Sequence, residues 1–191
     1  MKLSAEDRAR IQSSIASAEA QTSAHFACVI LPASDRYGLY PLVWGAALAL
    51  MVGAGLALLK PDLSLQYGVL IEMIAFAAFA LVFDWFQLRL LLVPKNAKRS
   101  HAHNLAHREF AARILSAGDH REGILFFVSL GERYVEILAT REVHARVGET
   151  AWNAIVADFT AAAKRGEIAN GAISAIEACA NHLSAHFPKA L

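Results

Sequence analysis

The sequence predicts a compact α/β domain with a two-helix transmembrane hairpin inserted into it. Two long apolar runs lie next to one another between Leu39 and Val93, and short apolar segments of strand length lie on both sides of them. Amphipathic helical patterns occupy the two ends of the chain. The expected order is a helix, a strand, two spans, a helix, two strands and two helices, and 191 residues suit one domain plus a small membrane module.

Composition supports a membrane module and gives no sign of nucleic-acid binding. Hydrophobic residues make up 56% and charged residues 18% of the chain, whereas globular domains average about 45–50% and about 25%. The net charge of +1 provides no basic field to attract DNA or RNA. Cys28 and Cys179 stand far apart in apolar patterns, so we expect buried thiols. The N-terminus lacks the apolar core of a secretory signal, so membrane insertion should use the internal segments.

The first part of the α/β domain is expected over residues 1–38. Ser4 and Asp7 resemble a capping box, and apolar residues then recur on one helical face, which predicts a helix over about 4–21. The continuously apolar run His25–Leu31 ends at Pro32 and is typical of a buried strand.

The two spans are predicted over residues 42–59 and 65–84. Leu42–Leu59 contains no charge, and a helix of this length covers roughly 27 Å of a ~30 Å hydrocarbon core. A turn at Lys60–Ser64 follows, and Asp84 marks the exit from the second run. The alternative is a pair of buried helices in a soluble core, but the two runs are longer than such a core needs and have no polar face.

Small residues recur every fourth position of the first span, at Gly45, Ala49, Gly53 and Ala57. This small-residue strip lets another helix approach closely, and the second span is the nearest candidate. A homodimer or another membrane protein is the alternative partner besides the lipid bilayer. Glu72 is costly in lipid and therefore a functional candidate by default, but the first span offers it no partner charge, which favours a structural role.

The second part of the α/β domain is expected over residues 95–191. A basic helix should run from Lys95 to about Leu115 along the membrane surface. Strands are expected at Ile124–Leu130 and Tyr134–Ala139, joined by a Gly-Glu turn. Two helical faces, starting near Trp152 and Ile173, close the chain.

Common catalytic signatures are missing from the sequence. It contains no Gly-rich phosphate loop, no Gly-x-Ser-x-Gly elbow and no His-Glu-x-x-His. Neither cysteine precedes a loop that ends in Arg, and no Asp-x-Asp follows a strand, so two common phosphatase nucleophiles are also missing. An enzyme here would need an unusual site, and no catalytic residue is assigned.

Two groups of residues are candidates for binding a cation or an anion. His103 and His107 have the spacing that places two imidazoles on one helical face around a transition metal, although histidines among basic residues can also form a solvated membrane surface. Acids in predicted loops or at the ends of predicted elements could bind Ca²⁺ or Mg²⁺, and two arginines could bind an anion or pair with the acids. The loop acids are Asp35, Asp119, Glu122, Glu132, Glu142 and Glu149, and the arginines are Arg121 and Arg141.

The segment Gly123–Ala139, followed by Trp152–Phe159 and Gly166–Glu177, resembles the TPM domain family, and Glu19–Ser23 resembles the start of that family. The resemblance covers roughly residues 4–35 and 105–188. It implies a compact α/β sandwich that is often attached to a membrane. For some members it also implies acid phosphatase activity and binding of Ca²⁺ or Mg²⁺.

This sequence differs from the TPM family pattern at two places where activity would be expected. Ala24-His25 replaces the Gly-Glu pair usual at the start of the first strand of the family, and Thr140–Ala145 replaces the Gly-rich loop after the hairpin of strands. The fold is therefore carried over and catalysis is not. With its inserted spans the chain looks like the small membrane version of the domain in bacteria.

These observations lead to a membrane-tethered, non-catalytic binding or scaffold module as the first hypothesis. The alternative is a divalent-cation-dependent, phosphatase-like hydrolase of the TPM family, which would need the loop acids to meet beside Arg121 or Arg141. A transporter or channel subunit would need several copies, because two spans with one acid enclose little pathway.

The charges that flank the spans predict the orientation of the protein in the bacterial inner membrane. Arg89, Lys95, Lys98 and Arg99 follow the second span, whereas the connecting turn offers only Lys60. Positive flanks stay in the cytoplasm, so both termini and the α/β domain are expected there.

Overall fold

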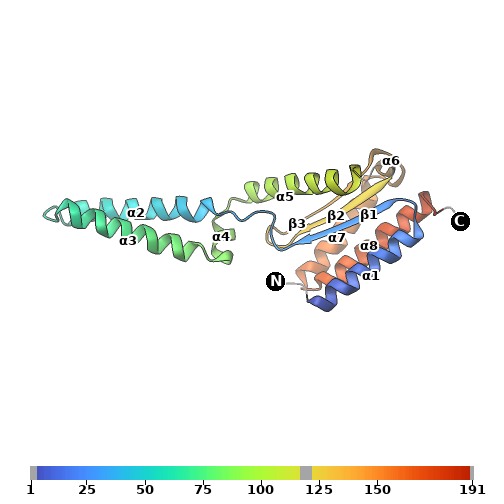
Figure 1. Cartoon of the computed structure of the whole chain (residues 1–191), viewed down its shortest axis with the longest axis horizontal. Coiled ribbons are helices and arrows are strands. Elements are labelled where there is room, and N and C mark those ends of the chain that lie inside the picture. The colour runs from blue at the N-terminus through green and yellow to red at the C-terminus, as the bar shows by residue number, and fades with distance from the viewer. Residues whose placement is uncertain (1–3, 117–121, 190–191) are drawn as a thin grey trace. The chain divides into compact units, whose positions relative to one another are not determined.

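The structure, a computed structural model, describes residues 4–116 and 122–189. The chain divides into two compact units. We call Met1–Ser34 together with Ser100–Leu191 the α/β unit, and Asp35–Arg99 the hairpin unit. Figure 1 shows a small sheet with helices in the first unit and a pair of long helices in the second. The predicted fold class, an α/β domain accompanied by two apolar helices, is confirmed.

The sheet of the α/β unit has three strands in the order β1-β2-β3. β1 (His25–Leu31) runs parallel to β2 (Gly123–Ser129), and β2 runs antiparallel to β3 (Tyr134–Ala139). All seven residues of β2 are buried. A strand covered on both faces has no polar side, which explains the uninterrupted apolar run from Gly123 to Val128 before Ser129 ends the strand.

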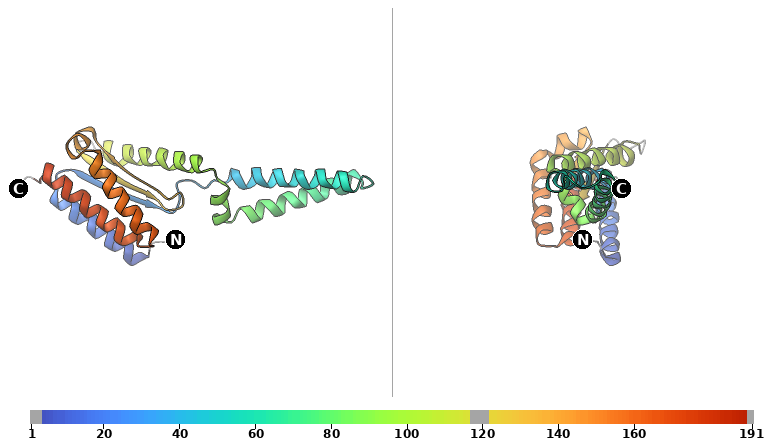
Figure 2. Two further views of the ribbon diagram at one scale, coloured as in Figure 1. Left: turned by 180° about the vertical axis from the view of Figure 1, so that it is seen from behind. Right: turned by 90° about the vertical axis from the view of Figure 1, so that its left-hand side faces the viewer.

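Three helices cover one face of the sheet: α1 (Ala5–Gln21), α7 (Glu149–Lys164) and α8 (Ile168–His186). Helix α8 contacts both α1 and α7 (Figures 1 and 2). Their apolar faces meet one side of the strands in the larger core, whose fully buried members include Ile124, Phe126, Ile176 and Leu183. The capping box is confirmed, since Ser4 Oγ accepts from the Asp7 amide at 3.0 Å and Asp7 Oδ2 accepts from the Ser4 amide at 3.3 Å.

The other face of the sheet is covered by α5 (Lys95–Phe110), which continues into a π-helical turn at Ala111–Leu115. Ala102 and Ala106 of α5 are completely buried against the sheet. Because alanine side chains are short, the helix backbone lies close to the strands, and longer side chains on neighbouring turns of α5 can reach strand residues.

The hairpin unit is inserted in the connection between β1 and β2. Parallel strands cannot be joined by a tight turn and need a crossover of a dozen or more residues. Here the crossover contains the whole hairpin unit and α5. The pairing of β1 with β2 therefore closes a long loop that contains the inserted segment.

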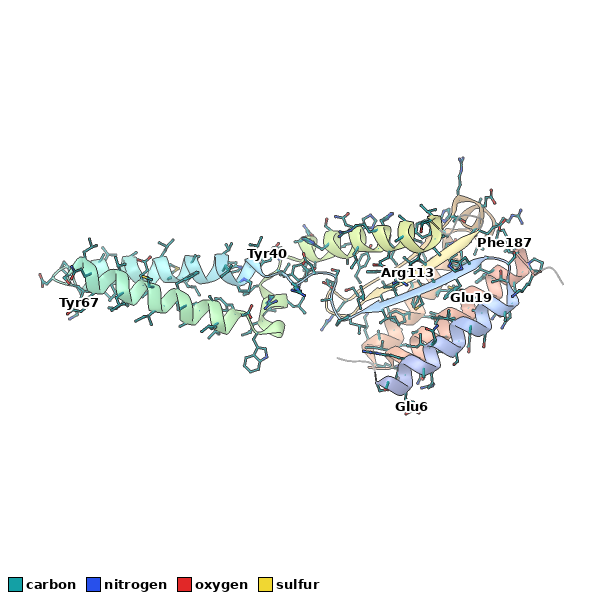
Figure 3. The ribbon with its side chains drawn as sticks, viewed as in Figure 1. Glu6, Glu19, Tyr40, Tyr67, Arg113 and Phe187 are labelled. Carbon is teal, nitrogen blue, oxygen red and sulfur yellow. The ribbon has the colours of Figure 1, made fainter. Side chains whose placement is uncertain are left out.

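Two antiparallel helices, α2 (Leu39–Leu59) and α3 (Leu65–Phe83), form the hairpin, and α4 (Phe86–Leu92) follows. The sequence predicted the two long helices but not α4. Tyr40 and Tyr67 lie near opposite ends of the hairpin (Figure 3).

The small-residue strip lies partly against α3. Gly45 and Ala49 are buried, and a β-carbon added at Gly45 would lie 3.3 Å from the backbone nitrogen of Ala80. Farther along, a β-carbon at Gly53 would meet the carboxylate of Glu72, whereas Ala57 is exposed. The first three positions of the strip therefore form the side of α2 that α3 approaches.

Arg89 of α4 joins the two ends of the hairpin. Its guanidinium donates to the carbonyl oxygens of Arg36 and Asp84, each at 2.8 Å, and forms an ion pair with the Asp84 carboxylate. The segment before α2 and the segment after α3 are therefore in direct contact.

A second short helix, α6 (Arg141–Val147), lies where the sequence predicted a loop. Seven residues are too few for a helical repeat to stand out in a sequence. Glu149, predicted to lie in a loop or at the end of an element, is the first residue of α7.

Candidate functional site

The acids predicted to gather around a cation lie in different parts of the fold. Asp35 begins the hairpin unit, is exposed, and accepts the Arg36 amide through Oδ1 at 2.6 Å. Glu122 immediately precedes β2, and its carbonyl accepts the His25 amide at 3.0 Å. Arg121 and Asp119 lie outside the described residues.

Arg141 and Glu142 lie at the same end of the sheet as Glu122. The Thr140 amide donates to the carbonyl of Gly123 at 2.9 Å, which fixes the start of α6 beside the start of β2. Arg141 and Glu142 are both exposed, and within residues 122–189 no ion pair links Glu122 to Arg141. The structure thus brings these three candidates to one end of the sheet without forming a closed set of ligands.

Glu132 lies at the opposite end of the sheet, in the turn between β2 and β3. Its Oε1 accepts both the amide and the hydroxyl of Ser34, at 2.9 and 2.8 Å, and the Ser129 hydroxyl donates to its other oxygen. These bonds tie the turn to the segment after β1. The carboxylate is engaged in holding the strands together, so Glu132 has a structural role.

Both thiols are held in the neutral form. Cys28 on β1 is half-buried, and Cys179 on α8 is completely buried. Burial raises the pKa of Cys28 to about 12, opposed by the positive charge of Arg113, and burial with the nearby Cys28 raises the pKa of Cys179 to about 12. A protonated thiol is a poor nucleophile, so neither cysteine is set up for covalent catalysis.

A polar groove of about 390 Å³ lies between α1 and α8. Arg10, Ser13, Ser17 and Glu177 contribute to its lining. The hydroxyls of Ser13 and Ser17 donate to helix carbonyls at 2.8 and 3.0 Å, so both protons are already engaged within the helix. The groove offers polar groups for binding rather than an activated nucleophile.

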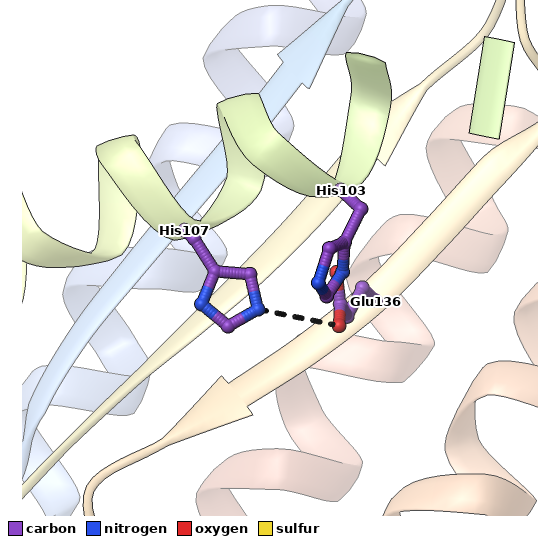
Figure 4. Close-up of side chains that lie close together, drawn as sticks. All are labelled: His103, His107 and Glu136. Carbon is purple, nitrogen blue, oxygen red and sulfur yellow. Dashed lines mark hydrogen bonds and ion pairs between the residues drawn. The ribbon is translucent and has the colours of Figure 1, made fainter. Parts of the chain in front are cut away.

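The two histidines singled out in the sequence lie together with a carboxylate on the α5 side of the sheet (Figure 4). Ring centroids of His103 and His107 are 4.3 Å apart. Glu136 of β3 reaches both rings, with Oε2 3.2 Å from His103 Nδ1 and Oε1 4.0 Å from His107 Nε2. One ligand atom from each residue lies within 4.8 Å of the other two.

Glu136 occupies this place because of strand alternation and is held there by a neighbour. Tyr134, Glu136 and Leu138 point to the α5 side of β3, while Val135 and Ile137 join the core on the other side. The Tyr134 hydroxyl donates to Glu136 Oε2 at 2.8 Å and lies 3.3 Å from His103 Nδ1. No motif or spacing in the sequence pointed to Glu136 or Tyr134 as site residues.

In the His103–His107–Glu136 cluster the two histidines are accessible to solvent, and the carboxylate is held in place. The side chains of the two histidines are about half exposed, at 48% and 52%, while that of Glu136 is 22% exposed. An ion can therefore reach the imidazoles from solvent, while the carboxylate is fixed by its strand and by Tyr134. Of the sites built from described side chains, this one has the donor set that best suits a metal ion.

Comparisons with known proteins agree with the fold. A sequence model of the TPM domain matches residues 85–182, from just before α4 into α8. The NMR structure of the BA42 protein from the psychrophilic bacterium Bizionia argentinensis is similar over 98% of this chain and 86% of that one, with a TM-score of 0.58 and 14% sequence identity. At this identity the likeness shows the fold alone. No curated protein matches the chain.

Proposed function

The chain belongs to the TPM domain family, and from this premise we propose that it is an integral membrane protein whose α/β unit serves as a non-catalytic binding or scaffold module. The main support for membrane insertion is the apolar exterior of the hairpin. Helices α2 and α3 contain 21 and 19 residues, long and apolar enough to cross a bilayer. A tether of this kind would keep the α/β unit at the membrane surface.

The exposure of apolar side chains on α2 and α3 favours membrane spans over the alternative, a pair of helices buried in a soluble core. The side chains of Leu50, Leu58 and Leu81 are 64%, 84% and 76% exposed. The core helices of a soluble protein bury such side chains, and large contiguous apolar surfaces are rare on soluble monomers. Lipid would cover them, and the tyrosines near both ends of the hairpin would lie at the two interfaces.

The packing of the hairpin supports an intramolecular role for the small-residue strip. Gly45 lies against the backbone of Ala80, so the place where the strip allows the closest helix contact is already occupied by α3. A second copy could not use the same positions without displacing α3. A homodimer would have to form through another face, such as the exposed side that carries Leu50 and Met51.

The non-catalytic part of the proposal is supported by the state of the candidate groups. The two thiols are protonated, the serines of the groove donate to carbonyls, and Glu132 is engaged by Ser34. The second candidate function is a cation-dependent hydrolase at the sheet end that carries Glu122, Arg141 and Glu142. It is favoured only by the proximity of these residues in the fold.

Alkaline carbonate extraction of isolated membranes tests the membrane part. We expect the full chain to stay in the membrane pellet, because two spans bury far more apolar surface than surface charge can replace. A variant with Leu50→Lys and Ile74→Lys should be released or degraded, since each lysine near the centre of a span costs about 2.5–3.5 kcal/mol.

The matched control carries Ala154→Lys and Ala161→Lys on the exposed side of α7. It adds the same charge to the α/β unit and should stay in the pellet. Recovery of the unaltered chain in the carbonate supernatant would contradict the proposal. Release of the α7 control would show that the extraction reports net charge instead of insertion.

A further inference from the structure

We propose that His103, His107 and Glu136 bind one divalent transition metal ion, with Zn²⁺ as the best fit. The inference concerns only the α/β unit and does not depend on membrane attachment. It rests on three side chains from two elements whose ligand atoms lie within 4.8 Å of one another. It names a metal class different from the Ca²⁺ or Mg²⁺ considered for the loop acids.

The ligand atoms determine the class of metal. Two imidazole nitrogens and one carboxylate oxygen suit zinc and neighbouring transition metals. Calcium and magnesium prefer sites made of oxygen ligands alone. A cluster in which nitrogen ligands outnumber oxygen ligands therefore selects against both of these ions.

The distances fit four-coordinate geometry after small side-chain rotations. With metal–ligand bonds of about 2.0–2.2 Å, two ligands of a tetrahedral zinc lie about 3.3–3.5 Å apart. Glu136 Oε2 is 3.2 Å from His103 Nδ1, Glu136 Oε1 is 4.0 Å from His107 Nε2, and one ligand atom from each of the three residues lies within 4.8 Å of the other two. Rotation of the half-exposed histidine side chains, which moves their nitrogens by ~1 Å, brings the three ligand atoms to tetrahedral spacing.

The backbone under the site is rigid. His103 and His107 are one turn apart on α5. This helix is fixed to the sheet by Ala102 and Ala106, which directly precede the two histidines and are completely buried. Glu136 sits opposite Phe127 of the buried central strand. The positions of the three ligands relative to one another are therefore set by the core and not by a loop.

Tyr134 is the positioning residue of the site. Its hydroxyl donates to Glu136 Oε2 at 2.8 Å, which orients the carboxylate toward the histidines. Partners of this kind around metal ligands typically contribute about 10–100-fold to affinity. Three protein ligands leave a fourth position for water or for an anionic group of a binding partner.

Calorimetric titration with Zn²⁺ tests the proposal. The full chain is purified in detergent without a histidine tag, freed of metal with a chelator, and titrated. We expect one Zn²⁺ per chain. The single variants His107→Ala and Glu136→Gln should each raise the dissociation constant by more than about 100-fold, and Tyr134→Phe by about tenfold.

His144→Ala supplies the matched control, because it removes an exposed histidine of α6 that lies outside the cluster. It should bind Zn²⁺ as the unaltered chain does. Circular dichroism of every variant checks that the fold is retained, which we expect because the substituted histidines are half exposed. Co²⁺ provides a spectroscopic readout, since a four-coordinate site gives stronger visible absorption than a six-coordinate one.

Three outcomes would overturn the proposal. One is the absence of stoichiometric Zn²⁺ binding by a folded chain. Another is Zn²⁺ binding that survives both His107→Ala and Glu136→Gln, which would place the ion elsewhere. The third is displacement of Zn²⁺ by an equal concentration of Ca²⁺ or Mg²⁺, which would indicate an oxygen site.

Discussion

The carboxylate of Glu72 lies over Gly53, and a β-carbon on that glycine would sit 3.1 Å from Glu72 Oε2. The single charged residue of the two long helices therefore packs against a residue without a side chain. Eight residues earlier along α2, Gly45 meets the backbone of Ala80 instead of a side chain. Two glycines of one strip thus face partners that differ in their freedom to move.

This difference predicts a ranking of glycine substitutions. Gly45→Leu should weaken the hairpin most, because the Ala80 backbone cannot move aside, and overpacking typically costs about 1–3 kcal/mol. Gly53→Leu should cost less, because the flexible Glu72 side chain can turn away. The measurement is the midpoint of SDS-induced unfolding in mixed micelles, followed by circular dichroism.

Gly55→Leu is the matched control for this ranking, since an added β-carbon there meets nothing within 4 Å. Its midpoint should be close to that of the unaltered chain. Equal losses for all three substitutions would mean that helix propensity, and not contact with α3, determines the effect.

Cys28 and Cys179 should react slowly with alkylating reagents until the α/β unit unfolds. With the pKa of each thiol raised from 9.0 to about 12, the thiolate fraction at pH 8 is about 1,000-fold below that of a free thiol. Labelling rates at pH 8 with and without denaturant measure the difference. Rapid labelling of the folded chain would show that the thiols are accessible and ionised.

The same thiols should make the α/β unit less stable in alkali. A raised pKa in the folded state means that the unfolded chain loses its thiol protons first, near pH 9. The contribution to stability is therefore complete below pH 9 and is lost as the pH rises toward 12. Denaturant unfolding across this range should show a shallower decline for the variant Cys28→Ala with Cys179→Ala, in which these groups no longer titrate.

Reporter fusions test the orientation that we propose for the chain in the membrane. A fluorescent reporter active in the cytoplasm should glow when fused after Leu191, and a reporter active only in the periplasm should be silent there. Inserted after Asp62, in the turn between α2 and α3, the same pair should give the reverse pattern. Activity of the periplasmic reporter after Leu191 would place the α/β unit outside the cytoplasm.

Phosphate release tests the non-catalytic assignment. Purified protein with Ca²⁺, Mg²⁺ or Mn²⁺ should hydrolyse generic phosphomonoesters no faster than a variant with Glu122→Ala, Arg141→Ala and Glu142→Ala. These three residues form the sheet end at which the alternative function, a hydrolase built on the loop acids, would place its site. Metal-dependent turnover that is lost in the variant would favour the hydrolase.

Most regular elements could be predicted because each repeats a pattern over enough residues. The capping box at Ser4 and the apolar run of β2 follow directly from local sequence. The short helices α4 and α6 could not be predicted, because seven residues give no clear period. Their formation depends on contacts made after folding, such as those between Arg89, Arg36 and Asp84.

The His103–His107–Glu136 cluster could be predicted only in part. The spacing of His103 and His107 shows that they share a helical face, and strand alternation shows that Glu136 shares a face with Tyr134. No local sequence pattern predicts that these two faces meet. Their meeting depends on the side of the sheet to which α5 packs, which is settled by Ala102, Ala106 and the core beneath them.

The place of the hairpin between β1 and β2 has a consequence for how the protein is made. Ser34 and Glu132, which bond across the ends of these strands, are 98 residues apart, so at about 5–20 residues per second β1 leaves the ribosome roughly 5–20 s before its partner. Closing so long a loop is slow when the chain between is disordered. A hairpin already folded in the bilayer would shorten the loop that must close between β1 and β2. Arg36 and Arg89, 53 residues apart in sequence, are in contact at the base of this hairpin. Under the proposed topology, the hairpin is synthesised and can enter the bilayer before β2 completes the sheet, and the newly made β1 stays without its partner strand until β2 arrives.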